Sequence, residues 1–192
     1  MYADNKMSTE IAEKVVKGNK AYYANAKVIK SKFLKRNTKM KMYKTIIRPV
    51  VTYWSETWTV TAKDENNLCI FDRQILRKIS GPVNINNIWR IRNNTEIDKL
   101  IECADIVRFT KAQRIKWLGH IQRMDQARPT RKLLDWEPMG TRPLGRPRQR
   151  WQEDVMEDFK KLKIKNWKEK AKARRTWRDL AEKAKTHKGL YC

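Results

Sequence analysis

The feature that most restricts the fold is a long basic stretch that contains no acidic residue. Between Lys14 and Ser55 the sequence holds twelve Lys or Arg residues and no Asp or Glu. The stretch therefore predicts helices with one face in a core and the other face uniformly cationic, although Gly18 weakens the helical pattern. The apolar and aromatic residues that recur at helix-like spacing are Ile11, Val15, Tyr22, Ala26, Ile29 and Phe33.

Part of this cationic face is a candidate track for phosphate groups. Lysine supplies a point charge without the planar fork of arginine, so contacts to a phosphate backbone are expected here, not the reading of bases. The candidate residues are Lys27, Lys30, Lys32, Lys35 and Arg36.

The composition of the whole chain indicates a folded protein that binds a polyanion. Its 192 residues carry a formal net charge of +24, yet 40% are hydrophobic and eight are Trp. A disordered basic tail would be poor in aromatic residues, and six Gly and six Pro exclude collagen-like and Gly/Pro-rich chains. Nucleic acid is the leading partner for such a charge.

Other sequence features bear on location. No apolar run approaches the ~18 residues of a membrane span, so no membrane partner is expected. The N-terminus, with Asp4 and Glu10, lacks the apolar region of a secretory signal. Cys69, Cys103 and Cys192 are an odd number at wide spacing, which argues against a disulfide framework or a zinc site. Reduced thiols and an intracellular location, nuclear or cytoplasmic, are predicted.

The expected fold is mainly α. Pro49 should end or kink its helix, a short extended segment is expected over 50–61, and residues 83–94 are expected to be irregular. Helices are expected over residues 8–33, 38–48, 61–80, 95–103, 105–124, 148–162 and 166–185. The expected regions are residues 1–60 and 61–127, both helical, an Arg/Pro/Gly-rich loop over 128–150, and basic helices over 151–192.

The strongest local signal is the run from Gly140 to Trp151, in which arginines alternate with Pro and Gly. Proline restricts the backbone, so these guanidinium groups are displayed at reduced entropic cost and can fork onto phosphates. Two interpretations stay open: backbone binding, or a solvated basic linker. Trp151 either stacks on an unpaired base or is buried in the core. The arginines concerned are Arg142, Arg146, Arg148 and Arg150.

A second cluster lies on or around the helix expected over 105–124. Residues three apart share one side of a helix, so an arginine, a tryptophan and a histidine at 114, 117 and 120 form either a surface facing nucleic acid or a buried Trp among solvated charges. The candidate residues are Lys111, Arg114, Lys116, Trp117, His120 and Arg123.

No catalytic or metal-binding constellation is recognised. The chain has no Ser/His/Asp or Cys/His set in a family-like context and no phosphate-cradling Gly loop. It is therefore not expected to be an enzyme by itself, and no cofactor is expected in it.

Several segments, in this order, resemble the C-terminal part of non-LTR (LINE-type) retrotransposon reverse transcriptases, in particular the endonuclease–reverse transcriptase group with RTE-like elements. Together they extend over most of the chain, from about Ser8 to Leu190. The matching residues are Gly18–Tyr23, Tyr43–Tyr53, Ser55–Thr59, Phe71–Arg77, Trp89–Arg92, Arg114–His120, Arg123–Met124 and Gly145–Trp151.

The resemblance implies a division of labour within a longer enzyme. The palm, with its metal-binding aspartates and Mg²⁺, would lie upstream of the matched region. Residues 18–53 would be the end of the palm and a helical thumb. The remainder would be a helical extension that holds template RNA and target DNA, with the palm as a further partner. The segment Tyr2–Asn5 echoes the Tyr-Ala-Asp-Asp polymerase motif, but it follows that motif's place and has only one carboxylate.

One residue departs from the family pattern. Trp54 stands where the family commonly has glycine before Ser-Glu-Thr-Trp, and this departure argues against the tight turn that the family pattern implies there.

Two functions are compatible with these observations. The first is a non-catalytic, nucleic-acid-binding C-terminal fragment of a retrotransposon reverse transcriptase. The alternative is an inactive remnant of such an element that serves as a helical protein-interaction module.

Overall fold

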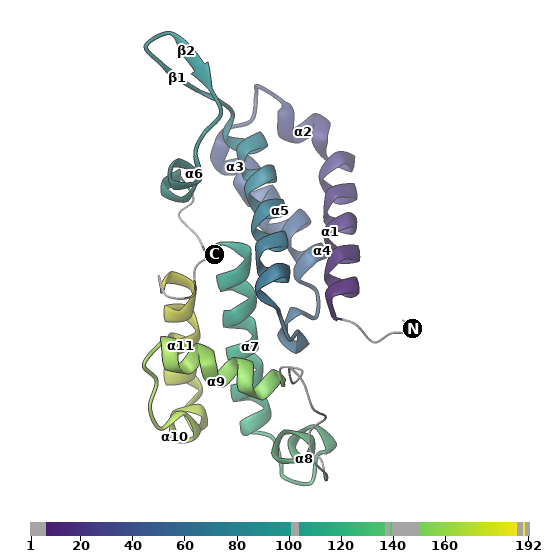
Figure 1. Cartoon of the computed structure of the whole chain (residues 1–192), viewed down its shortest axis with the longest axis vertical. Coiled ribbons are helices and arrows are strands. Elements are labelled where there is room, and N and C mark those ends of the chain that lie inside the picture. The colour runs from purple at the N-terminus through teal and green to yellow at the C-terminus, as the bar shows by residue number, and fades with distance from the viewer. Residues whose placement is uncertain (1–6, 101–103, 137–138, 140–149, 188–189, 191–192) are drawn as a thin grey trace. The chain divides into compact units, whose positions relative to one another are not determined.

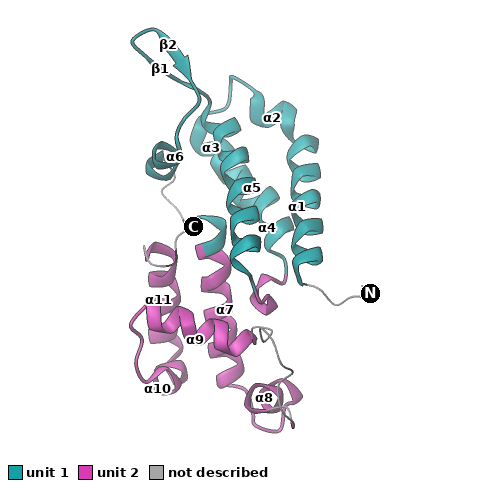
Figure 2. Ribbon diagram, in the orientation of Figure 1, with its two compact units in different colours: residues 1–53, 60–107, 192 teal, residues 54–59, 108–191 magenta. Residues whose placement is uncertain are grey.

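A computed structural model describes residues 7–100, 104–136, 139, 150–187 and 190 (Figure 1). These residues are mostly helical, as expected. The chain divides into two compact units (Figure 2). Unit 1 consists of residues 1–53, 60–107 and 192, and unit 2 consists of residues 54–59 and 108–191.

Unit 1 is a group of helices with one small hairpin. Its longest helices are α1 (Met7–Ala24) and α5 (Ala62–Ser80). The shorter elements are α2 (Ala26–Lys30), α3 (Arg36–Met42), a π-helical turn (Tyr43–Ile47), α4 (Arg48–Thr52), β1 (Val83–Ile85), β2 (Ile88–Arg90) and α6 (Asn94–Leu100).

Unit 2 contains a 3₁₀ turn (Ser55–Thr57) and most of α7 (Ile106–Gln122), whose first two residues belong to unit 1. The described residues that follow form α8 (Pro129–Asp135), α9 (Trp151–Lys161), α10 (Trp167–Lys172) and α11 (Arg174–Thr186). Phe159 and Trp177 meet edge to face in the core, with ring centroids 5.9 Å apart. Two predictions for this unit need correction. Residues 128–150 were expected to be non-helical, but residues 129–135 form α8. The single helix expected over 166–185 is interrupted at Ala173, which separates α10 from α11.

Gly18 does not interrupt α1, because its lack of a side chain is needed for packing. A Cβ atom at this position would lie 2.4 Å from Cγ2 of Val51 and 2.7 Å from Cζ of Phe71. The glycine that weakens the helical pattern in the sequence thus allows α1 to approach α4 and α5 closely.

The predictions around Pro49 are partly wrong. The helical path continues through Pro49, which lies in the first turn of α4. A proline inside a helix removes one amide donor and clashes with the carbonyl four residues earlier. That carbonyl belongs to Thr45, in the wider π-helical turn, which accommodates the proline. Residues 50–52 are consequently helical instead of extended.

The β structure is at residues 83–90 and not within 50–61. Strands β1 and β2 pair antiparallel, with Ile85 opposite Ile88. The turn residues Asn86 and Asn87 have φ angles of 51° and 64°, as a two-residue type I′ turn requires. Asparagine tolerates this left-handed conformation better than most residues, which explains a hairpin without glycine.

Trp54 adopts the left-handed backbone conformation that glycine favours, so a tight turn is present here. Its φ and ψ angles are 64° and 19°, in the left-handed region, and its carbonyl accepts hydrogen bonds from the Thr57 amide at 3.2 Å and hydroxyl at 2.9 Å. The side chain is 61% exposed, so it gains little from burial.

Replacing Trp54 by glycine is expected to raise the free energy of unfolding by about 0.5–1 kcal/mol. The left-handed region costs a non-glycine residue roughly 1–2 kcal/mol, and glycine's greater freedom in the unfolded chain offsets part of the gain. Urea unfolding measures the change. Trp54→Ala is the control, because alanine loses the indole but keeps the backbone penalty. An equal gain in both variants would place the effect in the side chain.

A buried carboxyl group joins three segments of unit 1. Asp72 of α5 is 3% exposed, accepts a hydrogen bond from the Tyr43 hydroxyl, and accepts another from the Ile106 amide at 3.1 Å. Burial, with a smaller contribution from nearby Asp105, raises the pKa of Asp72 to about 6, although the two hydrogen bonds and Arg48 oppose the rise. The folded state therefore favours the protonated form of Asp72 more than the unfolded chain does.

Asp72→Asn is expected to remove a pH dependence of stability. In the native chain the raised pKa contributes stability below about pH 4, and this contribution is lost as the pH rises to about 6. The loss is roughly 2–3 kcal/mol. Urea unfolding between pH 4 and 7 should show this slope in the native chain and not in the variant. The control is Asp179→Asn, an exposed site with the same charge change, and an unaltered slope in Asp72→Asn would contradict the assignment.

The prediction of reduced thiols is wrong for Cys69, which is disulfide-bonded. The other two cysteines, Cys103 and Cys192, lie outside the described residues. Spacing along a sequence does not reveal which distant thiols a helical fold brings together. The thiol argument for an intracellular location therefore no longer holds. Among the described residues, no helix has the length and apolar character needed to cross a membrane.

Candidate nucleic-acid interface

The five cations predicted in unit 1 are all exposed. They lie on α2, on the connecting segment 31–35 and at the start of α3, where buried Ile29 anchors α2 to the core. Phe33 lies among them and is 98% exposed. We call this set the α2–α3 surface: Lys27, Lys30, Lys32, Lys35, Arg36 and Phe33.

All charged residues in the part of the sequence that contains the α2–α3 surface are positive. No acidic residue occurs between Lys14 and Ser55 to neutralise it locally. Lys27 and Lys30 lie in the last turn of α2, where the partial negative charge of a helix C-terminus favours cations. The exposed Tyr23 ring lies nearby along the chain and has the Lys78 ammonium 5.1 Å from its centroid. The surface thus offers phosphate contacts and an aromatic ring to a polyanion.

Arg114 does not belong to an exposed surface. Its side chain is fully buried in unit 2, where its guanidinium pairs with Asp154 and, at 2.7 Å, with Asp158 of α9. It also donates to the Trp58 carbonyl at 3.4 Å, while Lys111 lies 4.0 Å from Asp158. Burial raises the pKa of Asp158, and the two cations oppose the rise. The prediction that Arg114 faces nucleic acid is therefore corrected: its charge is used inside the unit.

A signal for this ion cluster was present in the sequence. Asp154 and Asp158 are one helical turn apart and adjoin Val155 and Phe159, which form the apolar stripe of α9. Carboxylates this close to a core-facing stripe can enter the core, and a buried carboxylate requires a cation or hydrogen-bond donors there. Sequence reasoning missed this requirement, and so it missed the partner of Arg114.

The other members of the α7 cluster have separate roles. Lys116 pairs with Glu182 of α11 at 2.9 Å. Arg123 is half-buried and donates to the Ala171 carbonyl at 2.7 Å, and burial together with Arg174 lowers the pKa of Arg123. His120 is exposed, with its ring 5.4 Å from that of half-buried Trp117. The structure does not gather this cluster into one cationic face.

Only the end of the Arg/Pro/Gly-rich run lies within the described residues. Arg142, Arg146 and Arg148 lie outside them, whereas Arg150 is exposed immediately before α9. Its backbone amide donates to the Glu153 carboxylate at 3.3 Å. Trp151 is half-buried and donates its indole N–H to the Glu56 carbonyl at 2.7 Å.

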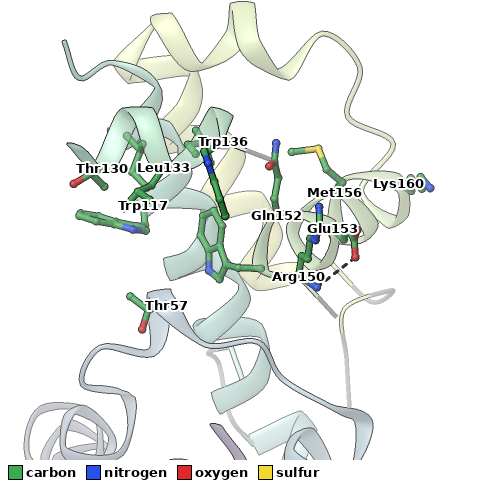
Figure 3. A pocket seen from close by; sticks show the side chains of 13 residues that line it. Thr57, Trp117, Thr130, Leu133, Trp136, Arg150, Gln152, Glu153, Met156 and Lys160 are labelled. Carbon is green, nitrogen blue, oxygen red and sulfur yellow. Dashed lines mark hydrogen bonds between the residues drawn. The ribbon is translucent and has the colours of Figure 1, made fainter. Parts of the chain in front are cut away.

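Unit 2 contains a cavity that the sequence did not predict, with a volume of about 810 Å³. In Figure 3, Trp117, Thr130 and Leu133 lie on one side of it, residues at the start of α9 lie on the other, and Trp136 lies between them. The side chains that line it are Thr57, Trp117, Ile121, Thr130, Leu133, Leu134, Trp136, Arg150, Trp151, Gln152, Glu153, Met156 and Lys160.

The chain is similar to a Caenorhabditis elegans protein whose name describes it as transposon-derived and uncharacterized. The two are 24% identical over 148 residues, which cover 74% of this chain and 53% of the relative. The chain therefore spans about half the length of that protein. No protein-family model matches the chain, and no solved structure matches it. The similarity supports an origin in a transposable element.

Among the described residues there is no group of three or more His, Cys, Asp or Glu that could hold a metal ion.

Proposed function

We propose that this chain is a non-catalytic, nucleic-acid-binding part of a retrotransposon reverse transcriptase of the LINE type, similar to RTE elements. It holds template RNA or target DNA mainly through the phosphate backbone. Polymerase chemistry and Mg²⁺ are assigned to a palm outside the matched region. The observation that carries the proposal is the α2–α3 surface, whose cations are all exposed on a stretch without acidic residues. The transposon-derived relative supports it.

The decisive experiment is a salt titration of affinity. Five neutralised phosphates give a slope of about −4.5 in a plot of log affinity against log salt on duplex DNA. Replacing Lys27, Lys30 and Lys32 together by glutamine is expected to reduce the steepness by two to three and the affinity roughly tenfold. Filter binding or fluorescence anisotropy with duplex DNA and with RNA measures both quantities.

The matched control removes the same charge from another part of the chain. Lys168, Lys170 and Lys172 of α10 are also exposed, and their replacement by glutamine changes the net charge equally. A specific α2–α3 surface requires a larger loss in the first variant than in the second. Equal losses would reduce the effect to net charge, and a flat salt dependence would overturn the proposal.

The alternative, a helical protein-interaction module, has its own observation. The β1–β2 hairpin and the residue after it expose Ile88, Trp89 and Ile91 at 70%, 67% and 74%. Exposed apolar groups gathered on one element are typical of protein interfaces. If this alternative is correct, the chain binds nucleic acid only weakly, and the two lysine variants lower that affinity equally. The same titration then shows only weak binding with no difference between them.

A further inference from the structure

The unit 2 cavity combines aromatic walls with a cationic rim. Its indoles come from three elements: Trp117 of α7, Trp136 at the end of α8 and Trp151 at the start of α9. The indole N–H of Trp151 is already bonded to the Glu56 carbonyl, so this ring is fixed in place. Trp136 and Leu133, which also line the cavity, are 60% and 68% exposed. Among the described residues of unit 2, these two side chains therefore present apolar surface to solvent.

The charged groups at the cavity favour an anionic ligand. Arg150 and Lys160 are exposed there, while the carboxylate of Glu153 is engaged by the Arg150 backbone amide at 3.3 Å (Figure 3). The net charge of +24 further disfavours cationic ligands. An apolar peptide segment would use the indoles but not the cations. A flat aromatic group joined to phosphates uses both.

The size of the cavity favours a single nucleotide over a duplex as its ligand. A volume of about 810 Å³ falls within the roughly 300–1,000 Å³ typical of small-ligand sites. The bases of a duplex are stacked inside it and cannot enter such a cavity without unpairing. Bases of a single strand stack readily on aromatic side chains.

We propose that this cavity holds one unpaired base of a single-stranded nucleic acid, stacked on the indole of Trp136 or Trp117, with the adjoining phosphates at Arg150 and Lys160. The inference rests on the proposed function and adds to it a preference for single strands. Contacts of this kind are tolerant of base identity, because every base presents a π face.

The test compares single strands with a duplex on the full chain. The probes are oligouridylate and oligodeoxythymidylate six nucleotides long, which separate RNA from DNA, and a blunt DNA duplex. Trp136→Leu is expected to weaken single-strand binding roughly five- to a hundredfold and to leave duplex binding within about twofold. Trp136→Phe keeps a ring and should retain most of the affinity. The matched control is Trp89→Leu, since Trp89 is exposed on the hairpin of unit 1.

Photochemical cross-linking locates the base directly. A hexamer with one 5-bromouracil is irradiated on the chain, and the cross-linked peptide is expected to contain Trp136 or Trp117. Cross-links that map only to other residues would overturn the inference.

The outcomes separate this inference from the proposed function. Equal losses for single strands and duplex in Trp136→Leu, or no loss, overturn the cavity while the lysine variants still test the α2–α3 surface. A selective loss in Trp136→Leu with no specific effect of the lysine variants supports the cavity and overturns the surface. Absence of binding to all three probes overturns both.

Discussion

Replacing Arg114 by leucine is expected to lower the free energy of unfolding by about 3–5 kcal/mol. The guanidinium of Arg114 is fully buried between Asp154 and Asp158, and its removal leaves two carboxylates in the interior of unit 2 without the cation that pairs with both. The cost of an unpaired buried charge exceeds the cost of the lost hydrogen bonds. Urea unfolding followed by tryptophan fluorescence measures the loss.

A triple variant separates lost pairing from stranded charge. Arg114→Met with Asp154→Leu and Asp158→Leu removes all three groups, and the replacement of such a triad by apolar residues is often neutral. We expect it to recover most of the stability that Arg114→Leu loses. The loss in the single variant should also shrink at acidic pH, because burial raises the pKa of Asp158 and protonation neutralises its stranded carboxyl group. A triple variant as unstable as the single one would show that packing, and not charge, dominates.

This cluster changes the interpretation of the most recognisable part of α7. The Arg114–His120 segment was predicted to face nucleic acid or to bury its Trp. In the structure Arg114, Ile115, Leu118 and Gly119 are buried, whereas Lys116 and Trp117 are partly exposed and His120 is exposed. The segment mainly joins α7 to α9 and α11. Its charged and aromatic residue types are the same in a binding helix and in a buried ion cluster, so residue types alone did not distinguish the two.

The helices were predictable where periodicity and end signals agreed. The helix predicted over 61–80 is confirmed as α5, where the Thr61 hydroxyl accepts from the Asp64 amide at 3.3 Å and the Asp64 carboxylate accepts from the Thr61 amide at 3.2 Å. The helix over 105–124 is likewise confirmed as α7. These signals are local, and local sequence contains them in full.

The predictions from the sequence were wrong or incomplete where contacts between distant residues determine the structure. Pro49 is accommodated by a π-helical turn, and Asn86 and Asn87 form a hairpin turn in which each residue is left-handed. The cavity of unit 2 depends on three tryptophans that come together from separate helices, which no spacing along the chain reveals. By contrast, the exposure of the α2–α3 cations followed from a local feature, the absence of acids and the position of Ile29 on the opposite, buried face.

Gly119→Ala is expected to destabilise unit 2 by about 3 kcal/mol or more, although alanine is the better helix former by about 1 kcal/mol. A Cβ at this position would lie 1.9 Å from Nε1 of Trp177 and 2.3 Å from its Cδ1. Trp177 is 2% exposed and donates its indole N–H to the Ile115 carbonyl at 2.8 Å. The ring therefore has no space into which to move, and accommodation requires loss of that hydrogen bond and displacement of α11 from α7.

A double-mutant cycle tests this geometry. Trp177→Ala removes the indole ring that meets the new methyl group, so Gly119→Ala should cost much less in the Trp177→Ala background than in the native chain. The expected coupling is about 2 kcal/mol, within the range found for residues in direct contact. Gln113→Ala, at another partly exposed position of α7, is the control for a change of helix propensity without this contact. Strict additivity in the cycle would mean that the indole does not occupy the space beside Gly119, and the close approach of α11 to α7 would then have to be abandoned as the reason for the glycine.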